Sequence, residues 1–242
     1  MAGARPHFLT LPQLERIPWL VHGFGTGVWE EADLERDERL RGFSPVIMRQ
    51  LHSEAIHCLE AAPEGRLEGD ALITDVPGLL LVVRTADCLP ALLVDGAHRA
   101  VAAVHCGWRG TRNRILGKAV KAMEEAYATD PRGLVAVLGP CIGPCCYEVG
   151  ADVRAAFAES GFDPLLFYER GGRLFLDLRA ANLGLLGALG VAGDNILSVG
   201  ACTHCAPGLV SYRRDKSEKR RMFNFIGIRR PLPEAPGSSV PQ

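Results

Sequence analysis

The chain has 242 residues, of which 48% are hydrophobic and 23% charged, and its formal net charge is -1. Such a chain can bury a substantial core, and it lacks the positive charge that draws proteins to nucleic acid or to an anionic membrane. No signal stretch opens the sequence, and the longest apolar region, 71–95, is interrupted by charged residues and a proline. We therefore expect a soluble, cytoplasmic protein with no nucleic-acid or membrane partner.

Cysteine content and chain organisation narrow the class further. Eight cysteines without a secretion signal favour thiols, metal ligands or catalytic groups over a disulfide framework. No internal repeat and no linker rich in glycine, serine or proline divides the chain. We expect one domain over residues 1–230 and a flexible tail over 231–242, where four prolines occur.

Taken in chain order, the expected strands are short and rich in valine, isoleucine and leucine. Several are continuously apolar, which is typical of strands that are covered on both faces. The expected strands are 46–51, 79–84, 91–94, 100–105, 134–138, 173–176 and 222–228.

Three segments between these strands have apolar residues at helical spacing. The first, 112–128, has Thr111 as its expected N-cap, and the second, 151–159, is expected to end at Gly161. The third follows Asp177, another good N-cap. Interleaved strands and helices predict an α/β or α+β layered sandwich, with mixed sheets covered by helices.

Polar side chains stand at the ends of three apolar runs. Cys88 follows one expected strand, His105 ends another and His52 follows a third. Binding crevices form at strand ends, because side chains there leave the packed core. Each residue alone is more simply a buried apolar cysteine or a hydrogen-bonded histidine. Their joint occurrence at strand ends favours a metal site.

The chain resembles the YfiH family, also called the laccase-domain or polyphenol-oxidase family, along nearly its whole length. The segments that carry the resemblance, in the family's order, are HGF at 22–24, QLHS at 50–53, GDALIT at 69–74, TADC at 85–88, HCGWRG at 105–110, GPCIGPCCYEV at 139–149 and SYRRD at 211–215. Two places depart from the family's pattern: the loop at 25–31 is short and has no arginine, and Cys106 replaces the usual alanine.

The resemblance implies a fold, a metal site and an activity. His52, Cys88 and His105 would be the metal ligands, at the strand ends of a YfiH-like layered fold. The implied activity is that of a purine nucleoside phosphorylase, with adenosine, inosine, guanosine or methylthioadenosine and phosphate as substrates. Adenosine deaminase activity, a hydrolase reaction, is implied as a second activity of the same site. Whether the protein is a monomer or a homodimer stays open.

The ligand types bear on which metal binds. One thiolate and two imidazoles suit Zn2+ with one open position, which is the catalytic arrangement. The same set also resembles a blue-copper site, to which Met48 or Met123 would add an axial ligand. Laccase chemistry is less compatible, because it needs several copper ions held largely by histidine. The seven histidines include no His-x-His pair.

Four further residues are candidates for the catalytic steps. Arg109 follows His105 by four residues at an expected helix start, and with Arg49 it is a candidate for binding phosphate. Asp70 and Asp87 are candidates for a general base or for orienting a ligand histidine. The arginines of 213–214 and 220–221 are expected to form a surface face, with binding of phosphate or of a partner chain as the alternatives.

Two other functions remain open. A metal-free cysteine hydrolase would use Cys88 as its nucleophile and His105 as its base. A non-enzymatic metal or redox module would use the five later cysteines, and His204 could be a further ligand. These are Cys141, Cys145, Cys146, Cys202 and Cys205, and we expect them to be buried or site-lining thiols.

Overall fold

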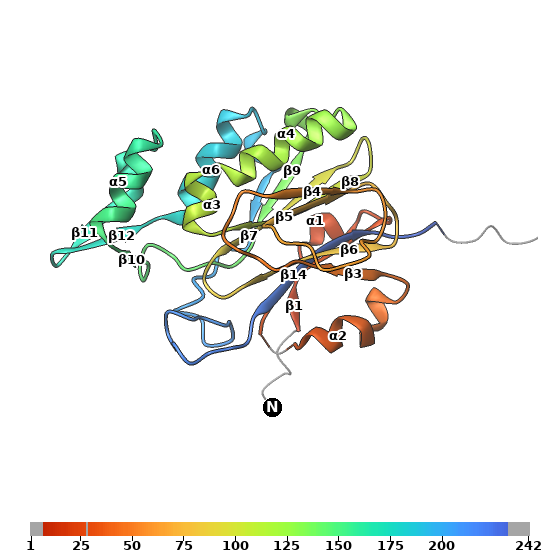
Figure 1. Cartoon of the computed structure of the whole chain (residues 1–242), viewed down its shortest axis with the longest axis horizontal. Coiled ribbons are helices and arrows are strands. Elements are labelled where there is room, and N and C mark those ends of the chain that lie inside the picture. Colours follow the sequence, from red (N-terminus) through yellow and green to blue (C-terminus); the bar gives the residue numbers. More distant parts are fainter. Residues whose placement is uncertain (1–6, 28, 232–242) are drawn as a thin grey trace, which may run out of the picture.

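Two β-sheets stacked face to face form the centre of the protein (Figure 1). The computed structural model describes residues 7–27 and 29–231. The five-stranded sheet has the order β1-β2-β14-β6-β3 and the six-stranded sheet the order β13-β9-β7-β8-β5-β4. The bounds of the first set are β1 Phe8–Leu9, β2 Leu20–Gly25, β14 Met222–Ile228, β6 Leu79–Thr85 and β3 Ser44–Ile47. Those of the second are β13 Ile196–Ser198, β9 Val135–Leu138, β7 Leu89–Asp95, β8 Ala100–Cys106, β5 Ala71–Thr74 and β4 Ile56–Leu59.

The continuously apolar strands are explained by burial of both faces. Along β8, Val101 and Ala103 face the five-stranded sheet, whereas Ala102 and Val104 face a layer of helices. Successive side chains of a strand point to opposite faces, so a strand with no polar face must be covered twice. The same alternation holds in β6, where Leu81 lies in the core between the sheets.

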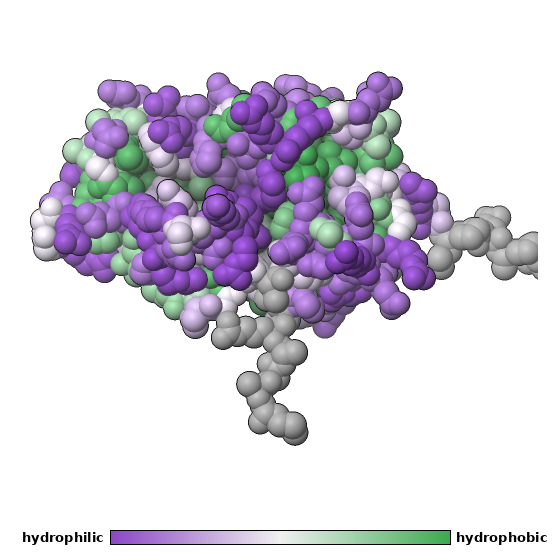
Figure 2. Space-filling model, turned by 60° about the horizontal axis from the view of Figure 1, so that its bottom comes forward, coloured by the Kyte–Doolittle hydropathy of each residue, from purple (hydrophilic) through white to green (hydrophobic). Residues whose placement is uncertain are grey.

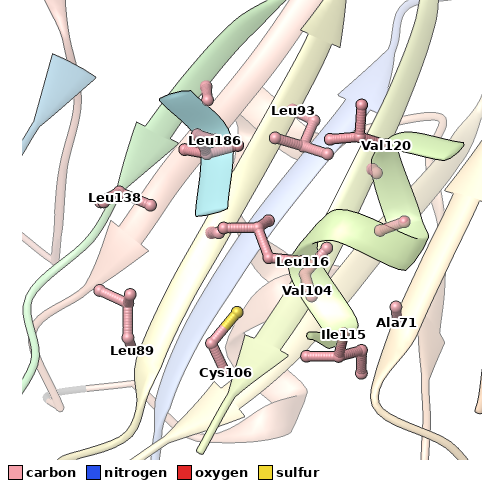
Figure 3. Close-up of a cluster of buried hydrophobic side chains, with 14 of the residues drawn as sticks. Ala71, Leu89, Leu93, Val104, Cys106, Ile115, Leu116, Val120, Leu138 and Leu186 are labelled. Atoms are coloured by element: carbon pink, nitrogen blue, oxygen red, sulfur yellow. The ribbon is translucent and has the colours of Figure 1, made fainter. Parts of the chain in front are cut away.

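Helices cover the outer face of the six-stranded sheet (Figure 1). In the close-up of Figure 3, Leu116 and Val120 of α4 meet Leu93 and Val104 of the sheet, and Leu186 of α6 closes the same cluster. The other sheet is covered on its outer side by Leu34 of α2, among others. The helix bounds are α1 Pro12–Glu15, α2 Glu31–Arg36, α3 Trp108–Arg112, α4 Ile115–Tyr127, α5 Ala151–Glu159 and α6 Leu178–Ala188.

A small three-stranded sheet with α5 extends from one side of the sandwich (Figure 1). Its antiparallel strands are β10 Glu148–Val149, β12 Arg173–Leu176 and β11 Phe167–Arg170. Short 3-10 helices complete the described elements, at Glu38–Leu40, Pro131–Gly133, Pro164–Leu166 and Gly193–Asn195.

The layered α+β class is confirmed, and one expected helix is wrong in its start. The segment 112–128 does not begin after Thr111, because the chain breaks between α3 and α4 at Arg114, which has φ 61°. Thr111 is buried inside α3, and its hydroxyl accepts a hydrogen bond from Asn182 of α6. Side-chain contact between helices, and not capping, therefore determines the position of Thr111.

Two further expectations concern the chain as a whole. No helix among the described residues is both long enough and apolar enough to traverse a lipid bilayer. The expected tail falls almost entirely at 232–242, outside the described residues. On the face shown in Figure 2, hydrophilic residues predominate and hydrophobic ones gather in separate areas.

Candidate metal centre and basic cavity

His52, Cys88 and His105 come together where the chain passes between the two sheets. Strands β3 and β6 run parallel, and the segments that follow them carry His52 and Cys88. His105 lies near the end of β8, paired with Pro90 at the start of β7. Because β7 begins directly after Cys88, the crossover from one sheet to the other places the thiol beside the imidazole.

The three donor groups are close enough to share one cation. A nitrogen or sulfur atom of each residue lies within 4.8 Å of the others, and Cys88 Sγ is 3.8 Å from His52 Nε2. The two imidazole rings meet edge to face, with centroids 4.9 Å apart and an interplanar angle of 81°. His105 is buried, Cys88 is half-buried and His52 is exposed, so the group opens to one side.

The buried carboxylate of Asp70 holds two of the three candidate ligands. Its Oδ1 accepts hydrogen bonds from His105 Nδ1 at 2.8 Å and from the amide of His52 at 3.1 Å. Its Oδ2 accepts from the amide and the hydroxyl of Ser53, at 2.6 and 2.7 Å. His52 has φ 58°, a left-handed conformation that turns successive amides toward this carboxylate. Asp70 therefore orients His105 and fixes the turn that carries His52.

Charges within the cluster favour a thiolate. Burial opposes ionisation of Cys88, but the charge and hydrogen bond of His105, together with His52, lower the pKa of the thiol to about 6. Burial likewise opposes the charge on His105, but Cys88 and Asp70 raise the pKa of its imidazole to about 9. Despite burial, hydrogen bonds from His105 and Ser53 hold the pKa of Asp70 at about 2. In the absence of a metal, the group therefore favours a thiolate–imidazolium pair.

Gly107 leaves space that the candidate ligands occupy. A Cβ atom at this position would lie 2.8 Å from Cδ2 of His52 and 3.2 Å from Sγ of Cys88. The distance of 2.8 Å is shorter than van der Waals contact, so the ring of His52 would have to move. A side chain at position 107 would therefore displace the imidazole or the thiol.

The cluster opens into a cavity of about 620 Å³ with a strongly basic wall. Asp87 is the acidic residue of its lining, and Trp108, Tyr147 and Tyr212 supply aromatic surface. The guanidinium of Arg109 stacks on the ring of Trp108, 4.4 Å from its centroid. The basic side chains of the lining, besides the two histidines, are Arg84, Arg109, Arg213, Lys216, Lys219 and Arg221. Such a wall attracts anions.

The four predicted catalytic residues fall in different places. Arg109 lines the cavity, and Asp70 lies behind His105. Asp87 also lines the cavity, but its carboxylate accepts hydrogen bonds from Thr203 Oγ1 and from the amide of Arg213, both at 2.6 Å. Arg49 is outside the lining, exposed and paired with Glu68. The structure therefore brings Arg109 and Asp87 to the cavity and leaves Arg49 apart.

Three sulfur atoms considered from the sequence lie away from the donor group. Met48 and Met123 are fully buried in separate hydrophobic clusters, and the cavity lining contains neither. The thiol of Cys106 points into the helix-covered core, among Leu89 and Leu116 (Figure 3), and burial raises its pKa well above the usual range. Cys106 and His105 alternate along β8, so they face opposite sides of the sheet.

Several cavity residues were not anticipated. Arg84 follows a run of apolar residues in β6, and its buried Nε has no hydrogen-bond partner among the described residues. A charged group at the end of a buried strand was the available signal for it. Lys216 and Lys219 come from a polar loop far along the chain, with no local pattern that indicates a site. Of the paired arginines, Arg213 and Arg221 line the cavity.

Comparison with known proteins places the chain in a family. A family model described as "Multi-copper polyphenol oxidoreductase laccase" matches residues 32–229. A purine nucleoside phosphorylase of Deinococcus radiodurans is 42% identical over 183 residues, which cover 76% of this chain and 70% of that protein. "Adenosine deaminase RL5", from an unknown prokaryotic organism, is 38% identical over 194 residues, covering 75% of this chain and 74% of the relative.

A solved structure gives the same result for the fold. The Bacillus licheniformis hypothetical protein YfiH superposes with a TM-score of 0.83 and 25% identity, covering 93% of this chain and 97% of its own. The expected resemblance is thereby confirmed by sequence and by fold. The chain belongs to the YfiH family of laccase-domain proteins.

Proposed function

We propose that the protein is a zinc-dependent purine nucleoside phosphorylase that acts on adenosine, inosine, guanosine and methylthioadenosine, and that the same site deaminates adenosine. The observation that carries the proposal is the convergence of His52, Cys88 and His105 at the floor of a basic cavity. The names of the relatives support the two activities.

The donor set fits zinc. One sulfur and two nitrogen donors lie within reach of a single ion, and the open side leaves room for a further ligand. Nδ1 of His105 is engaged by Asp70, which leaves Nε2 as its donor atom. Bound zinc would supply a Lewis acid and would lower the pKa of a coordinated water, the chemistry that hydrolytic deamination requires.

The cavity wall suits the two substrates of phosphorolysis. The guanidinium groups of Arg84 and Arg109 and the neighbouring lysines offer charge-assisted hydrogen bonds to phosphate. The buried Nε of Arg84, which has no hydrogen-bond partner in the described part of the chain, is a donor that phosphate could satisfy. Trp108 and Tyr147 give the purine aromatic surfaces in the same cavity. These residues would hold phosphate and nucleoside side by side, so that phosphate can attack the ribose carbon that bears the base.

Two alternatives are less well supported by the same geometry. Multicopper oxidation needs several metal ions with histidine ligands, but among the described residues only His52 and His105 belong to a group of candidate metal ligands. A cysteine hydrolase could use the Cys88–His105 pair. It would not require the basic wall or the third donor, His52.

The direct test supplies adenosine or inosine with phosphate and follows the free base, ribose 1-phosphate and ammonia. We expect phosphate-dependent release of the base by protein that holds one zinc ion at this site, and ammonia from adenosine without phosphate. His105→Ala should lose both products, whereas His98→Ala, which alters an exposed histidine at the far end of the same strand pair, should keep them. Activity of zinc-free protein that a thiol alkylator abolishes would instead establish the cysteine hydrolase.

Two arginines test the anion site. Arg109→Gln should raise the KM for phosphate about tenfold, since a charge-assisted hydrogen bond contributes roughly 1.5 kcal/mol or more. Arg49→Gln should leave it unchanged, because Arg49 pairs with Glu68 outside the cavity. Equal effects of the two substitutions on this KM would contradict the placement of phosphate.

A further inference from the structure

A second group of sulfur atoms lies outside the centre described above. The Sγ atoms of Cys145, Cys146, Cys202 and Cys205 all lie within 4.8 Å of one another. Cys205 Sγ is 3.4 Å from Cys146 Sγ and 3.7 Å from Cys145 Sγ. All four cysteines are free thiols in the structure. From the structure we infer that these four cysteines form a structural zinc site, separate from the catalytic centre.

The sulfur spacing matches a tetrahedral zinc site. Four zinc–sulfur bonds of about 2.3 Å in a tetrahedron place the sulfur atoms about 3.8 Å apart. The two sulfur–sulfur distances of 3.4 and 3.7 Å are close to this value and much longer than a disulfide bond of about 2.05 Å. Four thiolates with no open position are typical of structural zinc.

Burial of apolar sulfur does not explain the group. Cys145 and Cys205 are exposed, and Cys146 and Cys202 are only partly buried. A cysteine that serves as a small apolar filler belongs in the core, as Cys106 and Cys141 do in this chain. Four thiols gathered at the surface therefore need another reason to converge.

The fold brings the four cysteines together through a pair of parallel strands. Strands β9 and β13 are neighbours in register, with Leu138 opposite Ser198. The loops that follow them remain side by side, joined by a bridge between Cys141 and Cys202 and by a 3.1 Å hydrogen bond from the amide of Thr203 to the carbonyl of Cys141. In Figure 1 both loops leave the sheet on the side of β10. One loop supplies the adjacent cysteines and the other the Cys-x-x-Cys pair.

Donors around the loops suit a negatively charged thiolate cluster. The amide of Gly143 donates a hydrogen bond of 3.2 Å to Cys202 Sγ. Arg170 donates to the carbonyls of Pro144 and Cys145, and Arg214 donates to those of Thr203, His204 and Ala206. Two guanidinium groups therefore brace the two loops and offset the charge that four thiolates leave on one zinc ion.

The site would stabilise the wall of the catalytic cavity. Thr203, inside the Cys-x-x-Cys turn, donates its hydroxyl to Asp87, which precedes the ligand Cys88. Tyr147, which follows Cys146, lines the cavity itself. A zinc ion that ties the two loops together would hold both contacts in place, without itself meeting the substrate.

Zinc content of purified, reduced protein gives the first test. We expect two zinc ions per chain in the wild type, one for each group of ligands. Cys88→Ser and the double variant Cys202→Ser/Cys205→Ser should each retain one. Cys58→Ser removes an exposed cysteine outside both groups and should retain two. A double variant that keeps the full zinc content of the wild type, iron in place of the second zinc, or a disulfide among the four cysteines would overturn the assignment.

A spectroscopic test does not depend on how well the double variant folds. In Cys88→Ser, which lacks the thiolate of the catalytic centre, replacement of zinc by cobalt(II) should still give the intense sulfur-to-metal absorption and the visible bands of a four-thiolate tetrahedral site. Absence of these bands would sink the proposal. Because this result is independent of nucleoside turnover, a protein with two zinc ions and no phosphorylase activity would refute only the proposed function.

Discussion

The two groups of candidate metal ligands differ in where they are anchored and in how far they are closed. His52, Cys88 and His105 follow or end strands of the central sheets and open into a cavity. The four clustered cysteines lie on two loops beyond the edge pair of strands, and thiols supply all four positions. Three donors with an open side allow a substrate to reach the metal, whereas four donors exclude it.

The two groups of candidate metal ligands also differ in what holds their side chains in place. The three-ligand centre has a buried carboxylate behind it, Asp70, that fixes two of its members. The cysteine cluster is held mainly by backbone contacts and by two surface arginines, Arg170 and Arg214. A centre on rigid strands can keep a precise geometry for chemistry, and one on loops serves chiefly to hold those loops together.

The largest expected effect separates the roles of the two sulfur sites. Cys88→Ser should lower kcat/KM on the order of 10³-fold, since a catalytic metal contributes several kcal/mol to the transition state. Cys202→Ser/Cys205→Ser should lower kcat/KM far less, but should lower the melting temperature. When the same two substitutions are added to Cys88→Ser, the melting temperature should no longer respond to added zinc. Melting curves with and without a chelator, alongside steady-state kinetics, measure both. If the two changes affect activity equally, the division of roles is wrong.

The next effect concerns the carboxylate behind the open centre. Asp70→Asn replaces one of two accepting oxygens by an amide that would face N–H donors, so it should weaken zinc binding about 10- to 100-fold. Competition with a chelator measures the affinity, and added zinc should restore part of the activity. Asp95→Asn is the matched control, because Asp95 also accepts from a histidine Nδ1 at 2.8 Å but away from both metal groups. A loss of activity that excess zinc does not reduce would assign Asp70 another role.

A smaller effect tests how closely the ligands are packed. Gly107→Ala introduces a Cβ within 2.8 Å of His52, and we expect about a tenfold loss of zinc affinity from the overpacking. Gly96→Ala is the control, since an added Cβ there meets no atom within 4 Å. The same chelator competition applies to both variants. Unchanged affinity in Gly107→Ala would mean that the His52 turn yields easily.

Local patterns made much of the fold and of the donor set predictable. The strand at 222–228 and the helix at 151–159 match the structure, because their apolar spacing reports the faces that they bury. The three candidate ligands also emerged from their motifs. Strands such as β2 and β5 were missed: β2 contains HGFG, in which His22 and two glycines hide the strand pattern, and β5 is only four residues long.

The rest depended on contacts between distant segments. The cavity's basic wall joins Arg84 to Lys216 and Lys219, more than a hundred residues later, and no spacing rule connects them. The cysteine cluster likewise requires the parallel pairing of β9 with β13. Sequence reasoning expected buried or site-lining thiols there. The exposure of Cys145 and Cys205 could be seen only in the folded chain.

The smallest expected effect concerns the pair Asp95–His98, which resembles the pair Asp70–His105 but lies away from both metal groups. Burial alone would raise the pKa of Asp95, but the hydroxyl of Thr129, followed by hydrogen bonds from His98 and from the amides of His98 and Ala97, holds it below its usual value of 3.8. A carboxyl whose pKa is lowered by folding stabilises the protein above its unfolded pKa, and that contribution is lost as the pH falls through the folded value.

Asp95→Asn should therefore lower the free energy of unfolding by about 1 kcal/mol at pH 7 and at pH 5, with the difference from wild type shrinking below pH 3.8. Denaturant unfolding of both proteins across this range measures it. A difference that persists unchanged into the acid range would show that the Asp95 side chain stabilises the turn by shape and not by charge.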